Sequence, residues 1–329
     1  MVARSPLTDA LLERKRMNTI SDDSENSVLS LPLSEDVKRA FKLYREAVSA
    51  VELEVLERYA GQQVNIFAES KHLLEKRIKI PMRAVRQLTQ GIFEWIFESR
   101  TTHNFPCNLT PDNKACLEHF VSHIVNRPVV EIRSYISEIE NDAGLARHIV
   151  DTINNSKQRA YSDPVARFGR RLGWYALVRA LKPRVVVETG VDRGLGSVVF
   201  TSALMRNSAE GHPGYYYGLE IDQKCGLLFT APYSEYGEII YGDSLETLMQ
   251  IEKPIDFFIH DSNHSLEHER RELEVIQRKL ADNAILLSDN GPRVLMEFAE
   301  KTGRKFYYFK EITQEYWHGG ADIAVATNK

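Results

Sequence analysis

Hydrophobic and polar positions follow a helical period in the first half of the chain. From Ser34 to about Lys157, apolar residues recur every three or four positions, the spacing of helices that bury one face. The longest series, typical of a packed helical seam, consists of Val37, Phe41, Tyr44, Val48, Val51 and Val55. Pro81 suits the first turn of a further helix, and helical patterns follow around 111–125, 129–140 and 143–155. We therefore predict a helical domain over residues 34–157, after a polar, disordered segment over residues 1–33.

Beyond about residue 183, short apolar runs alternate with amphipathic segments. The runs predict strands at 184–189, 215–221, 237–241, 255–261, 283–289, 304–310 and 321–327. The segments between them predict helices at 194–206, 244–251, 265–280 and 292–302. This alternation is typical of an α/β fold with a doubly wound, mostly parallel, seven-stranded Rossmann-like sheet. The last two strands lack a helix-length connection, so we predict an antiparallel C-terminal pair in a domain spanning residues 158–329.

The first of these strands ends in a glycine-rich turn. Residues 185–187 are valines, Glu188 follows, and Gly190, Gly194 and Gly196 come before the next apolar segment. A buried strand, a tight turn and a helix start in this order are typical of a nucleotide-type cofactor site. The spacing differs from Gly-x-Gly-x-x-Gly, and Glu188 precedes the first glycine. A carboxylate at that place disfavours a pyrophosphate and favours a cationic or hydroxyl-rich ligand.

The second and third strands also end in acidic residues. Glu220 and Asp222 close the second strand, where a carboxylate can accept hydrogen bonds from ribose hydroxyls. Asp243 and Ser244 close the third strand, where Asp243 could accept a hydrogen bond from an adenine amino group. Each acid taken singly could equally be a helix N-cap or a solvated charge. Because ligands lie at the carboxyl ends of parallel strands, the repetition at successive strands favours a ligand site.

These motifs resemble those of the class I S-adenosylmethionine-dependent methyltransferases over residues 160–329. The resemblance implies that Glu188 and the glycine turn hold the methionine part of the cofactor, Glu220 the ribose and Asp243 the adenine edge. The full set of implied cofactor residues is Glu188, Gly190, Gly194, Gly196, Ser197, Glu220, Asp243 and Ser244.

A second stretch resembles the O-methyltransferases that include the macrocin-type enzymes. Residues 256–267, Asp-Phe-Phe-Ile-His-Asp-Ser-Asn-His-Ser-Leu-Glu, are similar to their Asp-x-x-Phe-Ile-Asp-Gly-Asp-His-Ser-Tyr-Glu motif, with departures at Ser262, Asn263 and Leu266. A further resemblance is to the metal-ligand pattern of the catechol-type O-methyltransferases. It consists here of Asp261 at the end of the fourth strand and of Asp289 and Asn290 at the end of the fifth. Neighbouring strands lie about 5 Å apart, so these three side chains could converge on one cation. Oxygen ligands suit Mg²⁺ or another hard divalent cation.

His264 lies three residues after Asp261, at the position of the general base in the catechol-type enzymes, so we interpret both as catalytic residues. The usual pKa of histidine, about 6.5, suits removal of a hydroxyl proton at neutral pH. Two alternatives stay open: His264 bonds a backbone group at the helix start, or Asp261 contacts substrate or cofactor without a metal. Trp317 and His318 are weaker candidates for the substrate pocket, since an ordinary aromatic hairpin would look the same.

Three arginines precede the first strand: Arg167, Arg170 and Arg171. They could contact a cofactor carboxylate or the substrate, and a solvated basic turn explains them equally well.

Composition limits the class of protein. The 329 residues are 43% hydrophobic and 27% charged, as in soluble globular proteins. A net charge of −4 excludes a global basic field that would recruit nucleic acid or an anionic membrane. We find no apolar run of membrane-spanning length and only three scattered cysteines, which fits reduced thiols. We therefore expect a cytoplasmic protein without a nucleic-acid or membrane partner.

We predict an S-adenosylmethionine-dependent methyltransferase that acts on a hydroxyl of a small molecule in a biosynthetic pathway, with a divalent cation and a histidine base. The long helical seam further predicts a homodimer formed through the N-terminal helices, which could also act as a lid. One alternative is a metal-independent N-methyltransferase that acts on a small molecule. The other is a module that binds S-adenosylmethionine without methyl transfer.

Overall fold

The computed structural model describes residues 38–39, 42–50, 71–102, 106–289, 291–314, 317 and 320–328. The chain divides into two compact units, Met1–Leu88 and Thr89–Lys329. In the first unit, residues 42–50 are helical and include Tyr44 and Val48 of the predicted seam. The other four members of the seam, like the predicted disordered segment 1–33, lie outside the described residues.

Helix α3 (Lys71–Glu98) begins earlier than the sequence predicts, so Pro81 lies inside the helix and not in its first turn. A proline inside a helix removes one backbone hydrogen bond, which is a small part of the bonding in a helix of 28 residues.

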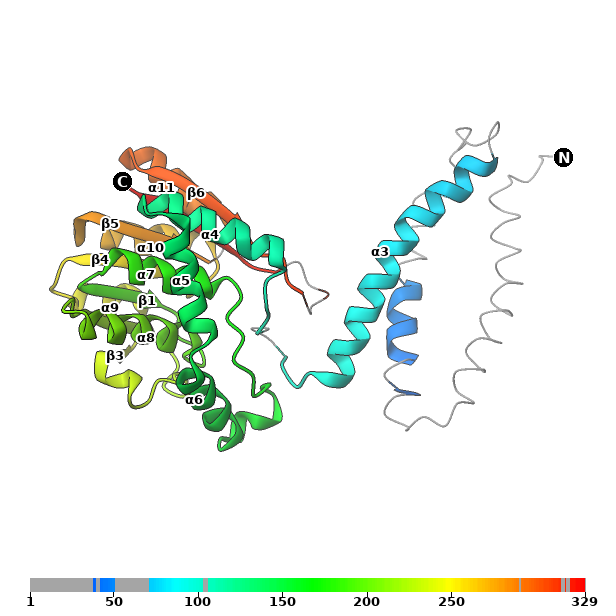
Figure 1. Cartoon of the computed structure of the whole chain (residues 1–329), viewed down its shortest axis with the longest axis horizontal. Coiled ribbons are helices and arrows are strands. Elements are labelled where there is room, and N and C mark those ends of the chain that lie inside the picture. The colour runs from blue at the N-terminus through cyan, green and yellow to red at the C-terminus, as the bar shows by residue number, and fades with distance from the viewer. Residues whose placement is uncertain are drawn as a thin grey trace. The chain divides into compact units, whose positions relative to one another are not determined.

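The second unit is built on a seven-stranded sheet with the order β3-β2-β1-β4-β5-β7-β6 (Figure 1). The strands are β1 (Val185–Thr189), β2 (Tyr215–Glu220), β3 (Gly237–Tyr241), β4 (Ile255–His260), β5 (Leu280–Ser288), β6 (Lys305–Lys310) and β7 (Asp322–Thr327). Neighbouring strands among β1 to β5 are parallel, whereas β7 is antiparallel to both β5 and β6. The predicted fold class, a mostly parallel Rossmann-like sheet with an antiparallel C-terminal pair, is confirmed.

Alternate residues of the central strands point to opposite sides of this sheet, and helices cover both of its faces. Val186 of β1 belongs to a hydrophobic core with α7 (Arg171–Leu181) and α8 (Leu195–Ala209). Val185 and Val187 belong to a second core with α9 (Ser244–Gln250), α10 (Leu266–Ile276) and α11 (Arg293–Thr302). Burial on both faces explains the continuous apolar run of β1.

Three further helices, α4 (Pro111–Val125), α5 (Val129–Glu140) and α6 (Ala143–Asn154), match the segments that the sequence predicts. Their apolar residues, such as Leu117 and Ile132, share one core with Trp174 of α7 and with the sheet. The compact unit that contains the sheet starts at Thr89, whereas the sequence pattern predicts a separate helical domain up to residue 157. Two short 3₁₀ helices, Lys157–Ala160 and Tyr233–Tyr236, complete the described elements.

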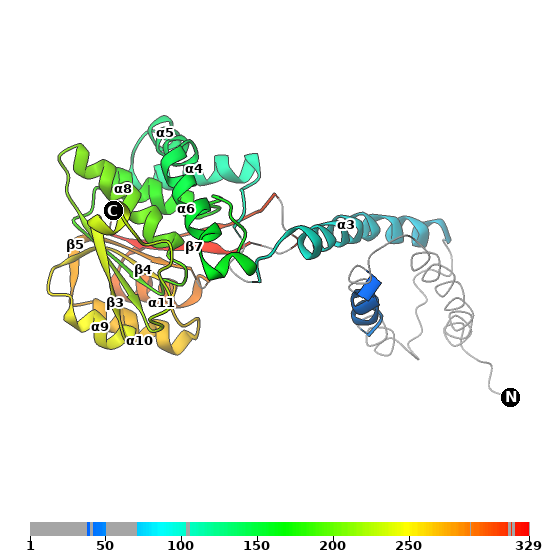
Figure 2. The same ribbon diagram turned by 90° about the horizontal axis from the view of Figure 1, so that it is seen from below.

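Figure 2 shows the same elements from below. Among the helices of the described segments, none combines the length and the apolar composition needed to cross a membrane.

Candidate functional site

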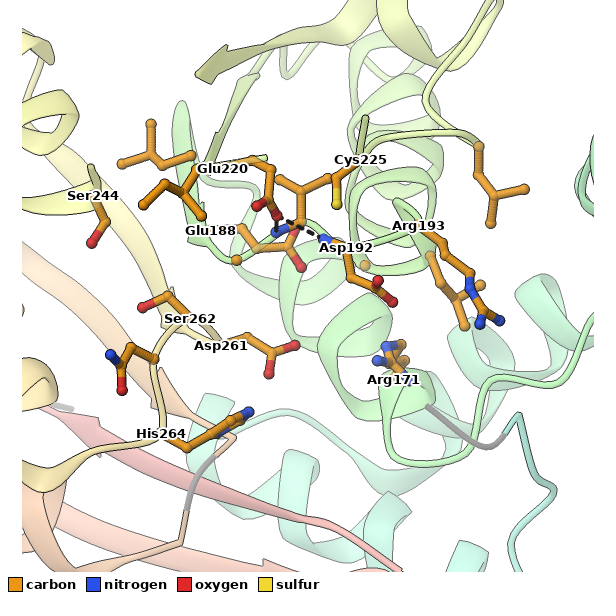
Figure 3. Close-up of a pocket in the computed structure, with 18 of the residues that line it drawn as sticks. Arg171, Glu188, Asp192, Arg193, Glu220, Cys225, Ser244, Asp261, Ser262 and His264 are labelled. Atoms are coloured by element: carbon orange, nitrogen blue, oxygen red, sulfur yellow. Dashed lines mark hydrogen bonds between the residues drawn. The ribbon is translucent and has the colours of Figure 1, made fainter. Parts of the chain in front are cut away.

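A cavity of about 590 Å³ lies at the carboxyl ends of β1, β2, β3 and β4 (Figure 3). Each of these strands contributes lining residues just where it ends. Helices α6 and α7 add residues from the other side, including Ile149, Ile153 and Arg171. The cavity therefore occupies the position at which parallel α/β sheets bind their ligands.

The glycine turn after β1 forms one wall of this cavity, and two of its glycines lack room for a side chain. Gly190 has φ +83°, and a Cβ there would lie 2.1 Å from the backbone oxygen of Asp261. A Cβ on Gly196 would lie 2.0 Å from Oε1 of Glu188. Gly194, with φ 87°, is the N-cap of α8 and does not line the cavity. The turn is thus packed directly against the end of β4 and against a carboxylate.

Glu188 is almost completely buried, with 1% of its surface exposed. Its Oε2 atom accepts hydrogen bonds from Ser197 Oγ, at 3.3 Å, and from the Tyr216 hydroxyl. Its Oε1 atom lies beside Gly196 at the cavity wall. Burial raises the pKa of Glu188 to about 8, although the hydrogen bond from Tyr216 and the charge of Arg171 oppose this rise. A cation bound at this wall would favour the ionised form.

Glu220 at the end of β2 both lines the cavity and fixes the glycine turn. Its Oε2 accepts hydrogen bonds from the backbone amides of Val191 and Asp192, both at 2.9 Å. Its Oε1 accepts one from the amide of Asp222 at 3.0 Å. The carboxylate is therefore held in place by the backbone around it.

Asp243 and Ser244 follow β3 and also line the cavity. Asp243 accepts a hydrogen bond from the Leu245 amide at 2.8 Å and so acts as the N-cap of α9. Asp243 therefore both caps helix α9 and lines the cavity. Ser197, in contrast, is buried between Glu188 and Tyr216 and does not line the cavity.

A buried polar network around Glu272 lies beneath the site, and none of the sequence motifs predicts it. Glu272 is fully buried in α10 and accepts hydrogen bonds from Thr189 at 2.8 Å and Ser262 at 2.7 Å. Further polar neighbours of its carboxylate are Ser244, His260 and His268. Despite the burial, these bonds lower the pKa of Glu272 to about 2. The spacing of His268 and Glu272, four residues apart on one helix, is the signal that could have revealed it.

Asp261 and His264 follow β4, and both line the cavity (Figure 3). Burial and the nearby Asp289 raise the pKa of Asp261 well above its usual value, and the two carboxyl groups are hydrogen-bonded to each other. His264 faces the cavity, and the surrounding protein lowers its pKa below the usual value by desolvation, partly offset by Asp289. A histidine with a lowered pKa is neutral at pH 7 and able to accept a proton.

Asp289, a predicted metal ligand, forms an ion pair with an arginine and does not line the cavity. Both of its carboxylate oxygens accept hydrogen bonds from the guanidinium of Arg170. Glu311 holds the same arginine, since its Oε1 accepts a hydrogen bond from the Arg170 amide at 2.7 Å. Asn290 lies outside the described residues. Among the residues that are described, no group of three or more His, Cys, Asp or Glu side chains could hold a metal ion.

Of the two weaker substrate candidates, the structure describes Trp317 alone. Trp317 packs edge-on against Trp95 of α3, with ring centroids 5.7 Å apart, and it does not line the cavity. Its backbone also lies against Gly91. His318 lies outside the described residues.

The sheet order, the glycine turn and the acids around one cavity define a class I methyltransferase fold, as the sequence resemblance implies. Residues 187–291 match the family model described as "Methyltransferase domain". Residues 187–291 of the chain thus correspond to a methyltransferase domain. Comparison with curated proteins gives no match.

Several solved structures are similar to the chain. The O-methyltransferase TomG from Streptomyces achromogenes, solved with SAM, is 16% identical, with 57% of this chain and 90% of that chain covered and a TM-score of 0.41. The SAH-bound methyltransferase PaMTH1 from Podospora anserina is 15% identical, with 59% and 93% covered and a TM-score of 0.42. The O-methyltransferase from Bacillus cereus, in complex with SAH, is 16% identical, with 65% and 97% covered and a TM-score of 0.38.

Proposed function

We propose that this chain transfers the methyl group of S-adenosylmethionine to a hydroxyl group of a small molecule, with His264 as general base. The observation that carries the proposal is that one cavity holds both Asp261 and His264 and the acids Glu188, Glu220 and Asp243. Donor and acceptor would then lie in one cavity, as direct transfer requires.

In this reaction the acceptor oxygen attacks the methyl carbon as the bond from that carbon to sulfur breaks. The products are a methyl ether and S-adenosylhomocysteine, and the hydroxyl proton passes to the imidazole of His264. The lowered pKa of His264 keeps this base neutral at pH 7. Asp261 lies in the same wall, where its raised pKa favours a protonated carboxyl that adds no negative charge beside the acceptor oxygen.

The predicted divalent cation does not fit the described part of its ligand set. Asp289 gives both oxygens to Arg170, and Asp261 is hydrogen-bonded to Asp289. Arg170 therefore already supplies the positive charge beside this acid pair. For this reason the proposed reaction uses no metal, in contrast to the sequence prediction based on Asp261, Asp289 and Asn290.

The ion pair between Arg170 and Asp289 also keeps a second candidate function open, which is the metal-independent transfer of a methyl group to a nitrogen atom. An amine acceptor needs a base to remove its proton but no cation to lower an oxygen pKa. The same cavity residues would serve it. The distinction between oxygen and nitrogen acceptors therefore requires product analysis.

The test measures methyl transfer from labelled S-adenosylmethionine to panels of small hydroxyl and amine acceptors, with and without EDTA. We expect a methylated hydroxyl product whose rate of formation does not change with EDTA. The variant His264→Gln should lower kcat by about 10²- to 10⁴-fold while cofactor affinity stays within about twofold. His212→Gln, in an exposed loop, is the matched control.

Other outcomes would replace the proposal in different ways. Methylation of amines alone would support the N-methyltransferase alternative. Complete loss of turnover in EDTA, restored by Mg²⁺, would establish the metal that we leave out. Tight cofactor binding with no product from either panel would identify a binding module.

A further inference from the structure

Asp261 points into the cavity and belongs to a buried cluster of charged side chains (Figure 3). Its carboxyl group is hydrogen-bonded to that of Asp289, whose side chain has 5% of its surface exposed. Two carboxyl groups in contact repel each other when both are ionised, so they need a positive charge or a proton beside them. The orientation of Asp261 therefore depends on groups that do not line the cavity.

Arg170, the N-cap residue of α7, supplies a positive charge to this pair. Both oxygens of Asp289 accept hydrogen bonds from its guanidinium, and the planar fork thereby fixes the orientation of that carboxylate. The guanidinium carbon also lies 5.4 Å from the centre of the Trp174 ring. Burial alone would lower the pKa of Arg170, but the charges of both aspartates and of Glu311 raise it. The arginine is thus within electrostatic reach of all three acids.

Glu311, the first residue after β6, fixes the position of Arg170. It is buried, and its Oε1 accepts hydrogen bonds from the Arg170 amide at 2.7 Å and from the Cys107 thiol at 3.3 Å. Its Oε2 accepts one from the Ala321 amide at 2.8 Å and lies 3.8 Å from Nη1 of Arg170. The residue before Arg170 is Gly169, where a Cβ would collide with Oε1 of Glu311. One acid therefore contacts both the backbone and the side chain of Arg170.

A purely structural role does not explain where this cluster lies. Buried ion pairs add little net stability, because removing charged groups from water costs about as much as their attraction returns. Arg179 on the same helix is also buried, and it forms ion pairs with Glu138 at 2.7 Å and Glu210 at 2.6 Å. These three residues do not line the cavity. The cluster around Arg170 differs because it includes Asp261, which does.

We propose that Arg170 and Glu311 are positioning residues, which hold the carboxyl group of Asp261 in one orientation at the cavity wall that also carries His264. Glu311 fixes the arginine, the arginine fixes Asp289, and Asp289 holds Asp261. Arg170, Asp289 and Glu311 do not line the cavity, so they act without touching donor or acceptor. This inference rests on the proposed function and adds the residues that keep this wall in the geometry required for transfer.

The test compares Arg170→Gln with Arg179→Gln in methyl transfer to the best hydroxyl acceptor of the panel and in urea denaturation. Both variants remove a buried, ion-paired arginine of the same helical segment, so both should lower the free energy of unfolding. Arg170→Gln should also lower kcat about 10- to 100-fold, with the affinity for S-adenosylmethionine within about twofold of wild type. Arg179→Gln should leave both quantities within about twofold of wild type.

Arg170→Lys keeps the charge but loses the planar fork, so it should recover part of the lost kcat. It replaces the glutamine variant if that variant does not fold. In that case its kcat should fall at least about threefold below that of the wild type, with cofactor affinity unchanged.

A double variant tests whether Glu311 acts through Arg170. Glu311→Gln alone should lower kcat about three- to tenfold, and its addition to Arg170→Gln should cause no further loss, because residues that act through one contact are not additive. Multiplied losses would overturn the role of Glu311. An unchanged kcat in Arg170→Gln, or an equal loss in Arg179→Gln, would overturn the whole assignment. A wild type that methylates no acceptor would overturn the proposed function as well.

Discussion

Replacement of Glu272 by glutamine should destabilise the methyltransferase unit by about 3 kcal/mol at pH 7. The folded protein lowers the pKa of this carboxyl from its usual 4.5 to about 2, because five polar side chains surround the ionised form. Each tenfold preference for the charged form is worth about 1.4 kcal/mol, so this difference corresponds to about 3 kcal/mol. Glutamine is neutral, as the protonated acid is, and loses this preference.

Urea denaturation followed by circular dichroism measures the effect, with Glu274→Gln on the exposed face of the same helix as the control. The wild type should keep the full contribution above pH 4.5, lose it progressively as the pH falls towards 2, and thus approach the variant in acid. A difference between Glu272→Gln and wild type below about 1 kcal/mol at pH 7 would refute the reasoning, as would a difference that does not shrink in acid.

Three other predictions concern the turn, the cofactor acid and the assembly. Gly196→Ala should weaken S-adenosylmethionine binding at least about tenfold in a calorimetric titration, because the new Cβ would lie 2.0 Å from Glu188 Oε1; unchanged affinity would contradict this geometry. Because the pKa of free Glu188 is about 8, binding of a cationic donor at pH 7 should release close to one proton, measured by calorimetry in buffers of different ionisation enthalpy. Glu188→Gln should abolish that release. Light scattering of the full chain should give about 75 kDa for the predicted homodimer, against 37.7 kDa for a monomer.

The sequence predicts the sheet and the acids that line one side of the cavity because the signals are local. The apolar run of β1, the glycines that follow it and the acids at the ends of β2 and β3 are each visible within a few residues. Glu188, Glu220 and Asp243 do lie around one cavity. The topology of a parallel sheet is sufficient to bring such strand ends together.

The sequence pattern does not predict helix α7, and the reason is physical. Nearly all of its residues, from Arg171 to Ala180, are buried, so it has no polar face and no helical alternation of polar and apolar positions. The sequence therefore left two interpretations of the arginines near its start equally open: contacts to a cofactor carboxylate or the substrate, and a solvated basic turn. Their burial and their different partners depend on the packing of α7 against the sheet.

The metal prediction fails to foresee a charged partner of Asp289 that is distant in sequence. Arg170 and Asp289 are 119 residues apart, and no local pattern relates them. A motif gives the type of a side chain at a strand end, but not the charge that another element places against it. The Glu272 network is hard to predict for a similar reason, since the charged residues Glu and Arg around it are typical of the exposed face of a helix.

The backbone bonds to Glu220 have a consequence for how the domain would distinguish nucleosides. A carboxylate offers about four acceptor positions, and three amide groups already occupy three of them. If Glu220 contacts the ribose, as the sequence resemblance implies, one position remains, so only one of the two sugar hydroxyls can bond to it. Deoxygenated analogues of the donor should therefore bind unequally, and the weaker of the 2′-deoxy and 3′-deoxy forms identifies the hydroxyl that Glu220 holds.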